Sequence, residues 1–228
     1  QQNTKNRLRL QNLKLWQQTT SKAHKQVQNY ILHGNLNGAV SVLENYHSQY
    51  NCDAKRATYN MVFSAAVKAM DKQVVEKVLN FFEQWSIPYD SVTYLSLLLW
   101  LGKSKRLQEV EHVWQKLKSE HPQFISVQII NAMITIIRKF QLGRERLKEV
   151  LDIASERQIP FSAMLYRELF NIYLDLNDME SFAALYEKYM AALSRDEVES
   201  HPHIWHHIIY MYALKHPRTL LIMSMPFE

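Results

Sequence analysis

Three lysines recur at intervals of 35 and 36 residues, a spacing at which their ammonium groups could bind a chain of phosphates. Lys68, Lys103 and Lys139 each stand near the end of an apolar, helix-like segment; Asp175 stands at the next such position and Lys215 lies near the one after it. Cations at a constant interval would follow a phosphate backbone and give salt-dependent binding. The alternative is that each lysine complements the dipole at the carboxyl end of its own helix. The sequence leaves both interpretations open.

Other residue types that could bind metal or catalyse a reaction do not form complete sets. His203 and His207 have the i, i+4 spacing of a zinc-chelating pair, but no cysteine or carboxylate completes a set of ligands. There is no glycine-rich phosphate loop and no nucleophile elbow. Asp175 and Asp178 alone do not make a metallonuclease centre. We therefore expect no metal, no cofactor and no enzymatic activity.

The elements that position the lysines form a repeat. Each begins with a bulky apolar residue, and the intervals between these residues are 35, 36, 36 and 39. Apolar residues then recur at i, i+3, i+4 and i+7, which predicts one buried face of a helix. All but the last of these helices are followed by a second amphipathic segment. The opening residues are Tyr59, Tyr94, Ile130, Tyr166 and Trp205.

Turn residues divide the chain into helical hairpins. Pro88, Pro122, Pro160 and Pro202 each follow a second helix, where proline stops its continuation, and Gly34 suits a tight turn. Stacked hairpins predict an all-α, right-handed superhelical solenoid of helix-turn-helix repeats with one concave face. Residues 1–19 are predicted to form a basic arm or helix, and 216–228 an extension or cap. The predicted repeats are 20–55, 56–90, 91–126, 127–162 and 163–201, followed by a final helix at 202–215.

Composition agrees with this fold class. Apolar residues make up 47% of the 228 residues, Gly and Pro together number only ten, and no segment alternates like a strand. No apolar run approaches the roughly 18 residues of a membrane span. The single cysteine, Cys52, excludes an internal disulfide framework and suits a reducing compartment. Because the chain begins with Gln1, we expect a fragment or a processed product.

Positive charge is concentrated at the start of the chain. Residues 1–43 hold six lysines and arginines and no acid, and the first acid is Glu44. The other 185 residues together carry one negative charge, since the formal net charge is +5. A basic, acid-free segment suits a phosphate backbone or an acidic partner, and it also resembles the end of a mitochondrial transit peptide. A solvated, glutamine-rich helix is the alternative.

Two segments carry a resemblance to a known family. "ATYNMVFSAAVKAM", followed by "SIPYD", resembles a pentatricopeptide repeat, and "SVTYLSLLLWLGKS" has the same opening. The tetratricopeptide repeat is disfavoured because its Trp-x-x-Leu-Gly-x-x-Tyr opening is absent and the period exceeds 34 residues. The resemblance covers about residues 20–215. It implies binding of single-stranded RNA in mitochondria or chloroplasts, with one base per repeat.

The resemblance also implies which residues would contact RNA. In this family the bases are read by the residue after the opening Tyr and by the last residue of the repeat. Asn60 with Asp90 corresponds to a uracil-reading pair, and Asn131 with Ser162 to a pair for a pyrimidine, usually cytosine. His24 with Lys55 is a further pair if residues 20–55 are a repeat. The family's phosphate contacts fall on Lys68, Lys103 and Lys139. The remaining base-reading positions are non-standard: Leu95 with Ser126, then Arg167 and His206.

The resemblance, together with the basic start of the chain, thus implies a single-stranded RNA-binding protein of the mitochondrial matrix. It would serve translation, stability or processing of a transcript without chemistry of its own. The alternative is a protein-interaction scaffold on the same repeats, such as a mitoribosome-associated or assembly factor, because Leu95 and Ile130 would place apolar groups on the groove. A degenerate array that only dimerises is a third interpretation.

Overall fold

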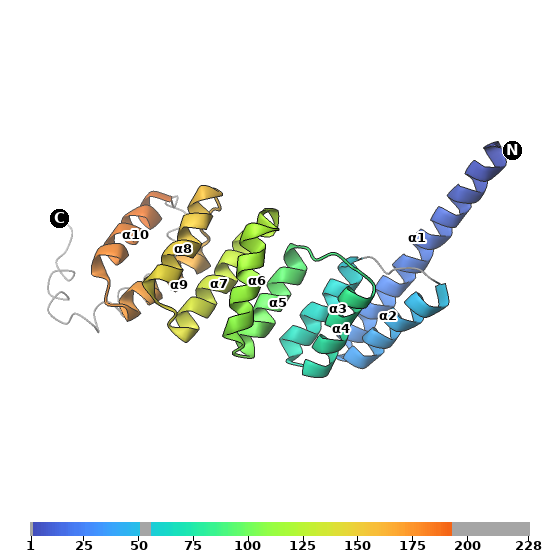
Figure 1. The fold of residues 1–228 in the computed structure, drawn as a ribbon, viewed down its shortest axis with the longest axis horizontal. Helices are drawn as coiled ribbons and strands as arrows, with labels where there is room; N and C mark the ends of the chain where they lie inside the picture. Colours follow the sequence, from blue (N-terminus) through green and yellow to red (C-terminus); the bar gives the residue numbers. More distant parts are fainter. Residues whose placement is uncertain (1, 51–55, 193–228) are drawn as a thin grey trace, which may run out of the picture. The chain divides into compact units, whose positions relative to one another are not determined.

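The described part of the chain is entirely helical. The computed structural model describes residues 2–50 and 56–192 (Figure 1). These residues form ten α-helices, one short 3-10 helix and no strand, which confirms the all-α prediction for them. The predicted helix at 202–215, its histidines, Lys55 and the extension at 216–228 lie outside the described residues. The helices are α1 (Gln2–Leu32), α2 (Leu36–Tyr50), α3 (Arg56–Ala69), α4 (Lys72–Gln84), α5 (Ser91–Lys103), α6 (Leu107–Ser119), η1 (Pro122–Phe124), α7 (Val127–Phe140), α8 (Gly143–Glu156), α9 (Ala163–Asp175) and α10 (Met179–Ala192).

Consecutive helices pack in pairs within two compact units. Unit 1 covers residues 1–125 and unit 2 covers residues 126–228. In unit 1, α1 packs against α2, α3 against α4, and α5 against α6. In unit 2, α7 packs against α8 and α9 against α10. These contacts are consistent with helical-hairpin repeats.

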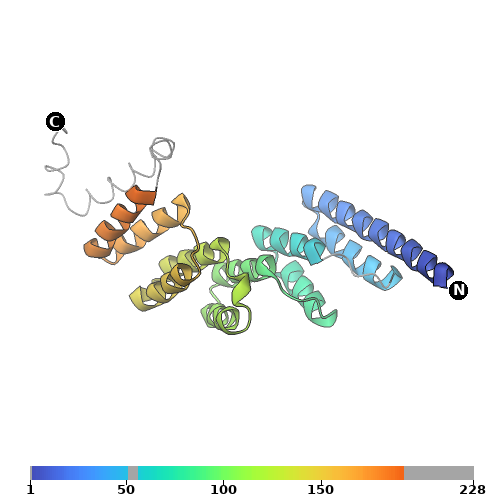
Figure 2. The ribbon, with the colours of Figure 1, turned by 90° about the horizontal axis from the view of Figure 1, so that it is seen from above.

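Within each unit, the first helix of a hairpin also packs against the first helix of the next hairpin. We call α1, α3, α5, α7 and α9 the first helices. In unit 1, α1 contacts α3 and α3 contacts α5, so the three hairpins lie beside one another in chain order (Figure 2). In unit 2, α7 contacts α9. The helix α1 continues without a break across the predicted boundary at residue 19, and its first half extends past α2 (Figure 1).

Short polar side chains begin several helices. Asp71, Ser126, Ser162 and Asp178 each accept a hydrogen bond from the backbone N–H three residues later. Asp90 forms a capping box with Thr93, in which each side chain bonds to the other residue's backbone. These bonds satisfy N–H groups that have no partner inside the helix. The helix starts that follow the prolines are therefore set by local chemistry.

Left-handed residues end seven of the described helices, and most of them are not glycine. At the end of α3, Met70 has φ 58°, and the N–H of Asp71 reaches the carbonyl of Ala66 at 3.0 Å. This six-to-one hydrogen bond is a Schellman motif. A residue other than glycine raises the free energy of the folded state by roughly 1 kcal/mol in this conformation. Gly34 ends α1 in the same way, and the non-glycine residues with positive φ are Met70, Ser86, Lys105, Gln141, Gln158 and Asn177.

Aromatic and aliphatic side chains fill the interior of each hairpin. In unit 1, Tyr59 and Phe63 of α3 are fully buried and both contact the ring of Phe82 from α4. Trp114 is 0% exposed and Trp100 is 4% exposed, as expected for core residues. Burying each large side chain stabilises the fold by about 1.5–3 kcal/mol. The two helices of each hairpin are therefore held by apolar packing.

Candidate nucleic-acid interface

The first predicted base-reading pair forms a hydrogen-bonded cluster in unit 1. Asn60 lies on α3 and is 5% exposed, while Asp90 lies at the start of α5. The Nδ2 of Asn60 donates to Asp90 Oδ1 at 2.9 Å. The hydroxyl of Thr93 donates to Asn60 Oδ1 at 2.7 Å. The amide of Asn60 is therefore held in one orientation, with one donor and one acceptor already engaged.

Asp90 is stabilised in its charged form. Burial of the carboxyl by itself raises its pKa, but the backbone and hydroxyl of Thr93, the amide of Asn60 and the charge of Arg56 outweigh that effect and lower the pKa below the ordinary value. The Nε of Arg56 lies 2.8 Å from Asp90 Oδ2. Asp90 is thus a fixed anion that orients Asn60, caps α5 and neutralises Arg56.

The second predicted pair is not joined in the same way. Asn131 lies on α7, and its Oδ1 is buried with no hydrogen-bond partner among the described residues. Ser162 is the N-cap of α9, and its Oγ accepts from the N–H of Leu165 at 3.3 Å. A buried amide oxygen without a donor costs roughly 1–3 kcal/mol. Asn131 therefore has an unused acceptor, whereas the acceptor of Asn60 is occupied.

The remaining predicted base-reading residues have different surroundings. Leu95 is half-buried, and Val92 and Leu99, which lie on the same side of α5, are 46% and 37% exposed. We call Val92, Leu95 and Leu99 the α5 apolar strip. Ser126 caps α7 by accepting from the N–H of Ile129. The fourth position, Arg167, is exposed, and His206 lies outside the described residues.

Arg167 lies beside an acidic residue that it shares with Arg138. The Nη2 of Arg167 lies 3.3 Å from Glu168 Oε1, and Arg138 of α7 lies 2.8 Å from Glu168 Oε2. Arg138 also lies 3.7 Å from Asp175, the residue that interrupts the lysine series. Glu168 is thus shared between two arginines, so this surface of unit 2 is less positive than its arginines alone would make it.

The three lysines of the predicted phosphate series are all exposed in the last turns of their helices. Lys68 has no hydrogen bond or ion pair with any residue that the structure describes. Lys103 donates to the carbonyl of Val67, near the end of α3, at 3.4 Å. Lys139 lies 5.3 Å from the ring of Phe140. Lys103 therefore contacts the carboxyl end of the preceding first helix and not that of its own helix, and it keeps two further N–H groups for a ligand.

Hydrogen bonds between successive first helices were not predicted. We call three contacts in unit 1 the first-helix hydrogen bonds, and each connects one first helix to the next. Their signal is present in the sequence, because the repeated Thr-Tyr pair places Thr58 and Thr93 on neighbouring helices at the same register. His24 occupies on α1 the place that Asn60 occupies on α3. The three contacts are His24 Nδ1 to Thr58 Oγ1 at 3.0 Å, Thr93 Oγ1 to Asn60 Oδ1 at 2.7 Å, and Ser64 Oγ to Ser96 Oγ at 2.7 Å.

Trp85, whose indole ring could in principle stack on a base, is engaged in aromatic stacking within unit 1. Trp85 stacks on His47 of α2 at 3.9 Å between ring centroids and on Phe81 of its own helix at 4.4 Å. It is only partly exposed. Trp85 therefore packs α4 against α2.

Comparisons with known proteins give no relative. No family model matches the chain, and no curated protein matches it. Among the described residues, no group of three or more histidines, cysteines or acids is placed to hold a metal ion. None of the helices formed by those residues is long and apolar enough to cross a membrane.

Proposed function

We propose that this chain is a pentatricopeptide-type repeat protein that binds single-stranded RNA and acts after transcription in the mitochondrial matrix. The observation that carries the proposal is the Asn60–Asp90 contact. These two residues are 30 positions apart, and a 2.9 Å hydrogen bond joins them where the resemblance expects a base-reading pair. The repeats would form a right-handed solenoid whose first helices face the RNA.

The proposed mechanism divides the contacts between bases and phosphates. Asn60 would offer its second N–H and its second carbonyl lone pair to one base, because the first of each is bonded to Asp90 and Thr93. Asn131 would turn its amide toward the base, because the amide oxygen is buried and has no partner among the described residues. Lys68, Lys103 and Lys139 would neutralise phosphates without reading sequence. The protein would hold a transcript for translation, stabilisation or processing and would perform no chemistry itself.

Fluorescence anisotropy with a labelled U-rich single strand tests this proposal. The variant Lys68→Gln/Lys103→Gln/Lys139→Gln should lower the slope of log K against log salt by about 2, because each phosphate contact contributes about 0.7. The control Lys72→Gln/Lys116→Gln/Lys148→Gln removes three exposed lysines from second helices and should keep the slope. Absence of binding at low salt by a folded wild-type protein would refute the proposal.

Base reading is tested by the ratio of the affinities for two RNA sequences and not by the affinity for one of them. Asn60→Ala should reduce the ratio of affinities for U-rich and A-rich strands several-fold, because it removes a group that contacts base edges. A change in folding alone would weaken both strands equally. An unchanged ratio would therefore remove Asn60 from the reading role.

A second candidate function is a protein-interaction scaffold, for example one associated with the mitoribosome. The α5 apolar strip favours it, since Val92 and Leu99 expose apolar surface that suits a partner helix. A photo-crosslinking amino acid at Leu99 should then capture one protein from mitochondrial extract, and the same group at Lys116 should not. Equal capture at both sites would exclude this role for the strip.

A further inference from the structure

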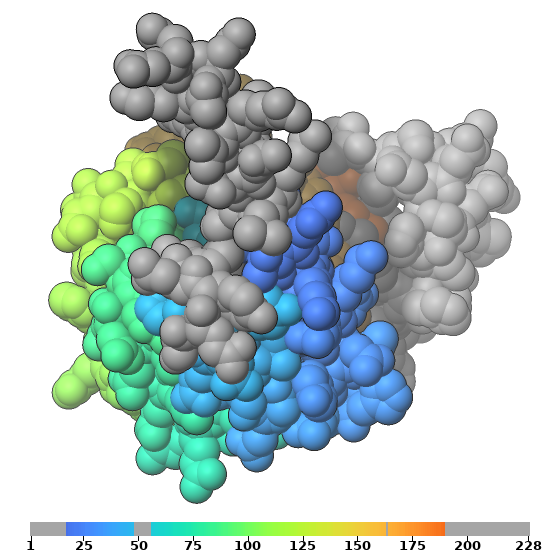
Figure 3. Space-filling model, turned by 90° about the vertical axis from the view of Figure 1, so that its right-hand side faces the viewer, coloured from blue at the N-terminus to red at the C-terminus, as the bar shows by residue number. Residues whose placement is uncertain are grey.

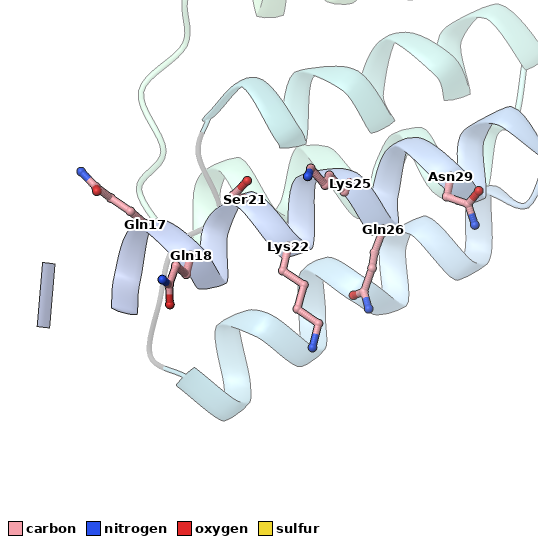
Figure 4. Close-up of a pocket in the computed structure, with 7 residues that line it drawn as sticks. All are labelled: Gln17, Gln18, Ser21, Lys22, Lys25, Gln26 and Asn29. Carbon is pink, nitrogen blue, oxygen red and sulfur yellow. The ribbon is translucent and has the colours of Figure 1, made fainter. Parts of the chain in front are cut away.

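The exposed face of α1 is polar and hollowed. Thr20, Ala23 and Val27 are fully buried on the side of α1 that packs into unit 1. An open hollow lies on the exposed side, and its described lining comes from α1. The described side chains of α1 and α2 lie on the surface that is blue in Figure 3. The described residues that line it, all shown in Figure 4, are Gln17, Gln18, Ser21, Lys22, Lys25, Gln26 and Asn29. We call these seven residues the α1 polar face.

The side chains of the α1 polar face extend from two sides of the helix. Gln18, Lys22 and Gln26 extend from one side of α1 in Figure 4, together with Asn29. Ser21 and Lys25 extend from the other side. A ligand lying across α1 would therefore meet an ammonium group on each side, with amide groups beside it.

The helix α1 itself contains basic residues and no acid. All of the basic residues in the acid-free start of the chain belong to α1, so a helix of about 46 Å carries a charge of +6. Within the described residues, Lys22 and Lys25 have no ion-pair partner. The one acid of α2, Glu44, is held by Lys77 of α4 at 2.9 Å. The charge of Lys22 and Lys25 is therefore available to a ligand.

We propose that the α1 polar face binds the phosphodiester backbone of RNA as an anchor in addition to Lys68, Lys103 and Lys139; this inference rests on the proposed RNA-binding function and adds a second contact site to it. Ammonium groups neutralise phosphates, and the amides of Gln17, Gln18 and Gln26 can donate to phosphate oxygens or pair with ribose hydroxyls. A membrane-surface helix needs an exposed apolar face, which these seven residues lack. An acidic peptide is the other polyanion that this charge would attract, and competition by poly-glutamate tests it.

The double variant Lys22→Gln/Lys25→Gln tests the anchor. Both residues are exposed, and glutamine keeps the helix propensity, so far-UV circular dichroism should not change. Binding to a labelled 20-residue oligo(U) is titrated between 50 and 200 mM salt. Loss of two phosphate contacts should lower the slope of log K against log salt by about 1.4 and weaken binding about 25-fold at 0.1 M salt. Oligo(A) should lose the same factor, because phosphate contacts do not read bases.

Matched variants separate the anchor from the groove. Lys116→Gln/Lys148→Gln removes two exposed lysines of second helices and should keep the slope. An unchanged slope in Lys22→Gln/Lys25→Gln, with a reduced slope in the Lys68/Lys103/Lys139 variant, would refute the anchor and leave the proposed function standing. A reduced slope in Lys22→Gln/Lys25→Gln, with an unchanged slope in the Lys68/Lys103/Lys139 variant, would keep the anchor and refute phosphate binding by Lys68, Lys103 and Lys139.

Two further outcomes would overturn the inference. A folded wild-type protein that binds no oligo(U) at 50 mM salt would refute both the anchor and the proposed function. Poly-glutamate that competes as well as oligo(U) at equal charge would show that the α1 polar face binds any polyanion, which removes the assignment to a phosphodiester backbone.

Discussion

The substitution Thr93→Val tests the hydrogen-bonded cluster between α3 and α5. Thr93 is 0% exposed, and valine keeps its shape while removing the hydroxyl. The change leaves Asn60 Oδ1 buried without the donor that now lies at 2.7 Å. An unsatisfied buried acceptor costs about 1–3 kcal/mol, so we expect unit 1 to lose about 2 kcal/mol of unfolding free energy. For a unit of this size, that corresponds to a fall of about 8 °C in Tm.

Tryptophan fluorescence can follow unit 1 alone. After the substitution Trp205→Phe, thermal unfolding monitored by fluorescence reports residues 1–125, because the remaining tryptophans all belong to that unit. Ser119→Ala is the matched control, since it removes an exposed hydroxyl whose only described bond is to the carbonyl of Gln115, and its effect should stay within about 0.5 kcal/mol. The remaining tryptophans are Trp16, Trp85, Trp100 and Trp114.

A double substitution checks the cause of the loss. Asn60→Leu/Thr93→Val removes the acceptor together with its donor, so no unsatisfied Asn60 oxygen remains. The double variant should therefore lose less stability than the sum of the two single variants. If Thr93→Val costs no more than Ser119→Ala, or if the two losses add, the cluster does not hold α3 to α5 as we infer.

Two other substitutions test local features of the fold. Asp90→Asn keeps a capping side chain but removes the charge. Because the folded-state pKa of Asp90 is lowered, the loss of stability in this variant should be complete above about pH 4, the ordinary pKa, and should disappear as the pH falls through the folded-state pKa. Urea titrations at several pH values would measure this difference. A difference that grows toward acid would contradict this sign. Gln141→Gly relieves the left-handed conformation at φ 51° and should stabilise unit 2 by up to about 1 kcal/mol in urea unfolding followed by circular dichroism, whereas Thr135→Gly within α7 should destabilise it.

The repeat period and the helix starts could be predicted because they depend on short-range patterns. Tyr59 and Tyr94, two of the recurring bulky residues, are buried near the starts of α3 and α5. Prolines and capping residues such as Asp90 and Ser162 then mark where the next helix begins. These signals act within a few residues, so they can be read without knowledge of tertiary contacts.

The surroundings of the site residues could not be predicted in the same way. Whether Asn60 is exposed depends on Thr93 and Asp90, which reach it from the next hairpin. The carbonyl that Lys103 contacts belongs to a residue 36 positions away. The left-handed helix ends at residues such as Met70 and Gln141 carry no glycine, so composition gave no signal for them. Contacts between repeats and strained turns thus require the three-dimensional arrangement.

The first-helix hydrogen bonds have a mechanical consequence for unit 1. Apolar burial is non-directional, whereas a hydrogen bond such as Ser64–Ser96 at 2.7 Å weakens steeply once its atoms separate. Each hairpin of unit 1 is therefore latched to its neighbour at a defined register. Under a stretching force these hydrogen bonds would resist small displacements and then break one after another. Unit 1 would therefore extend in discrete steps and not as a uniformly elastic body.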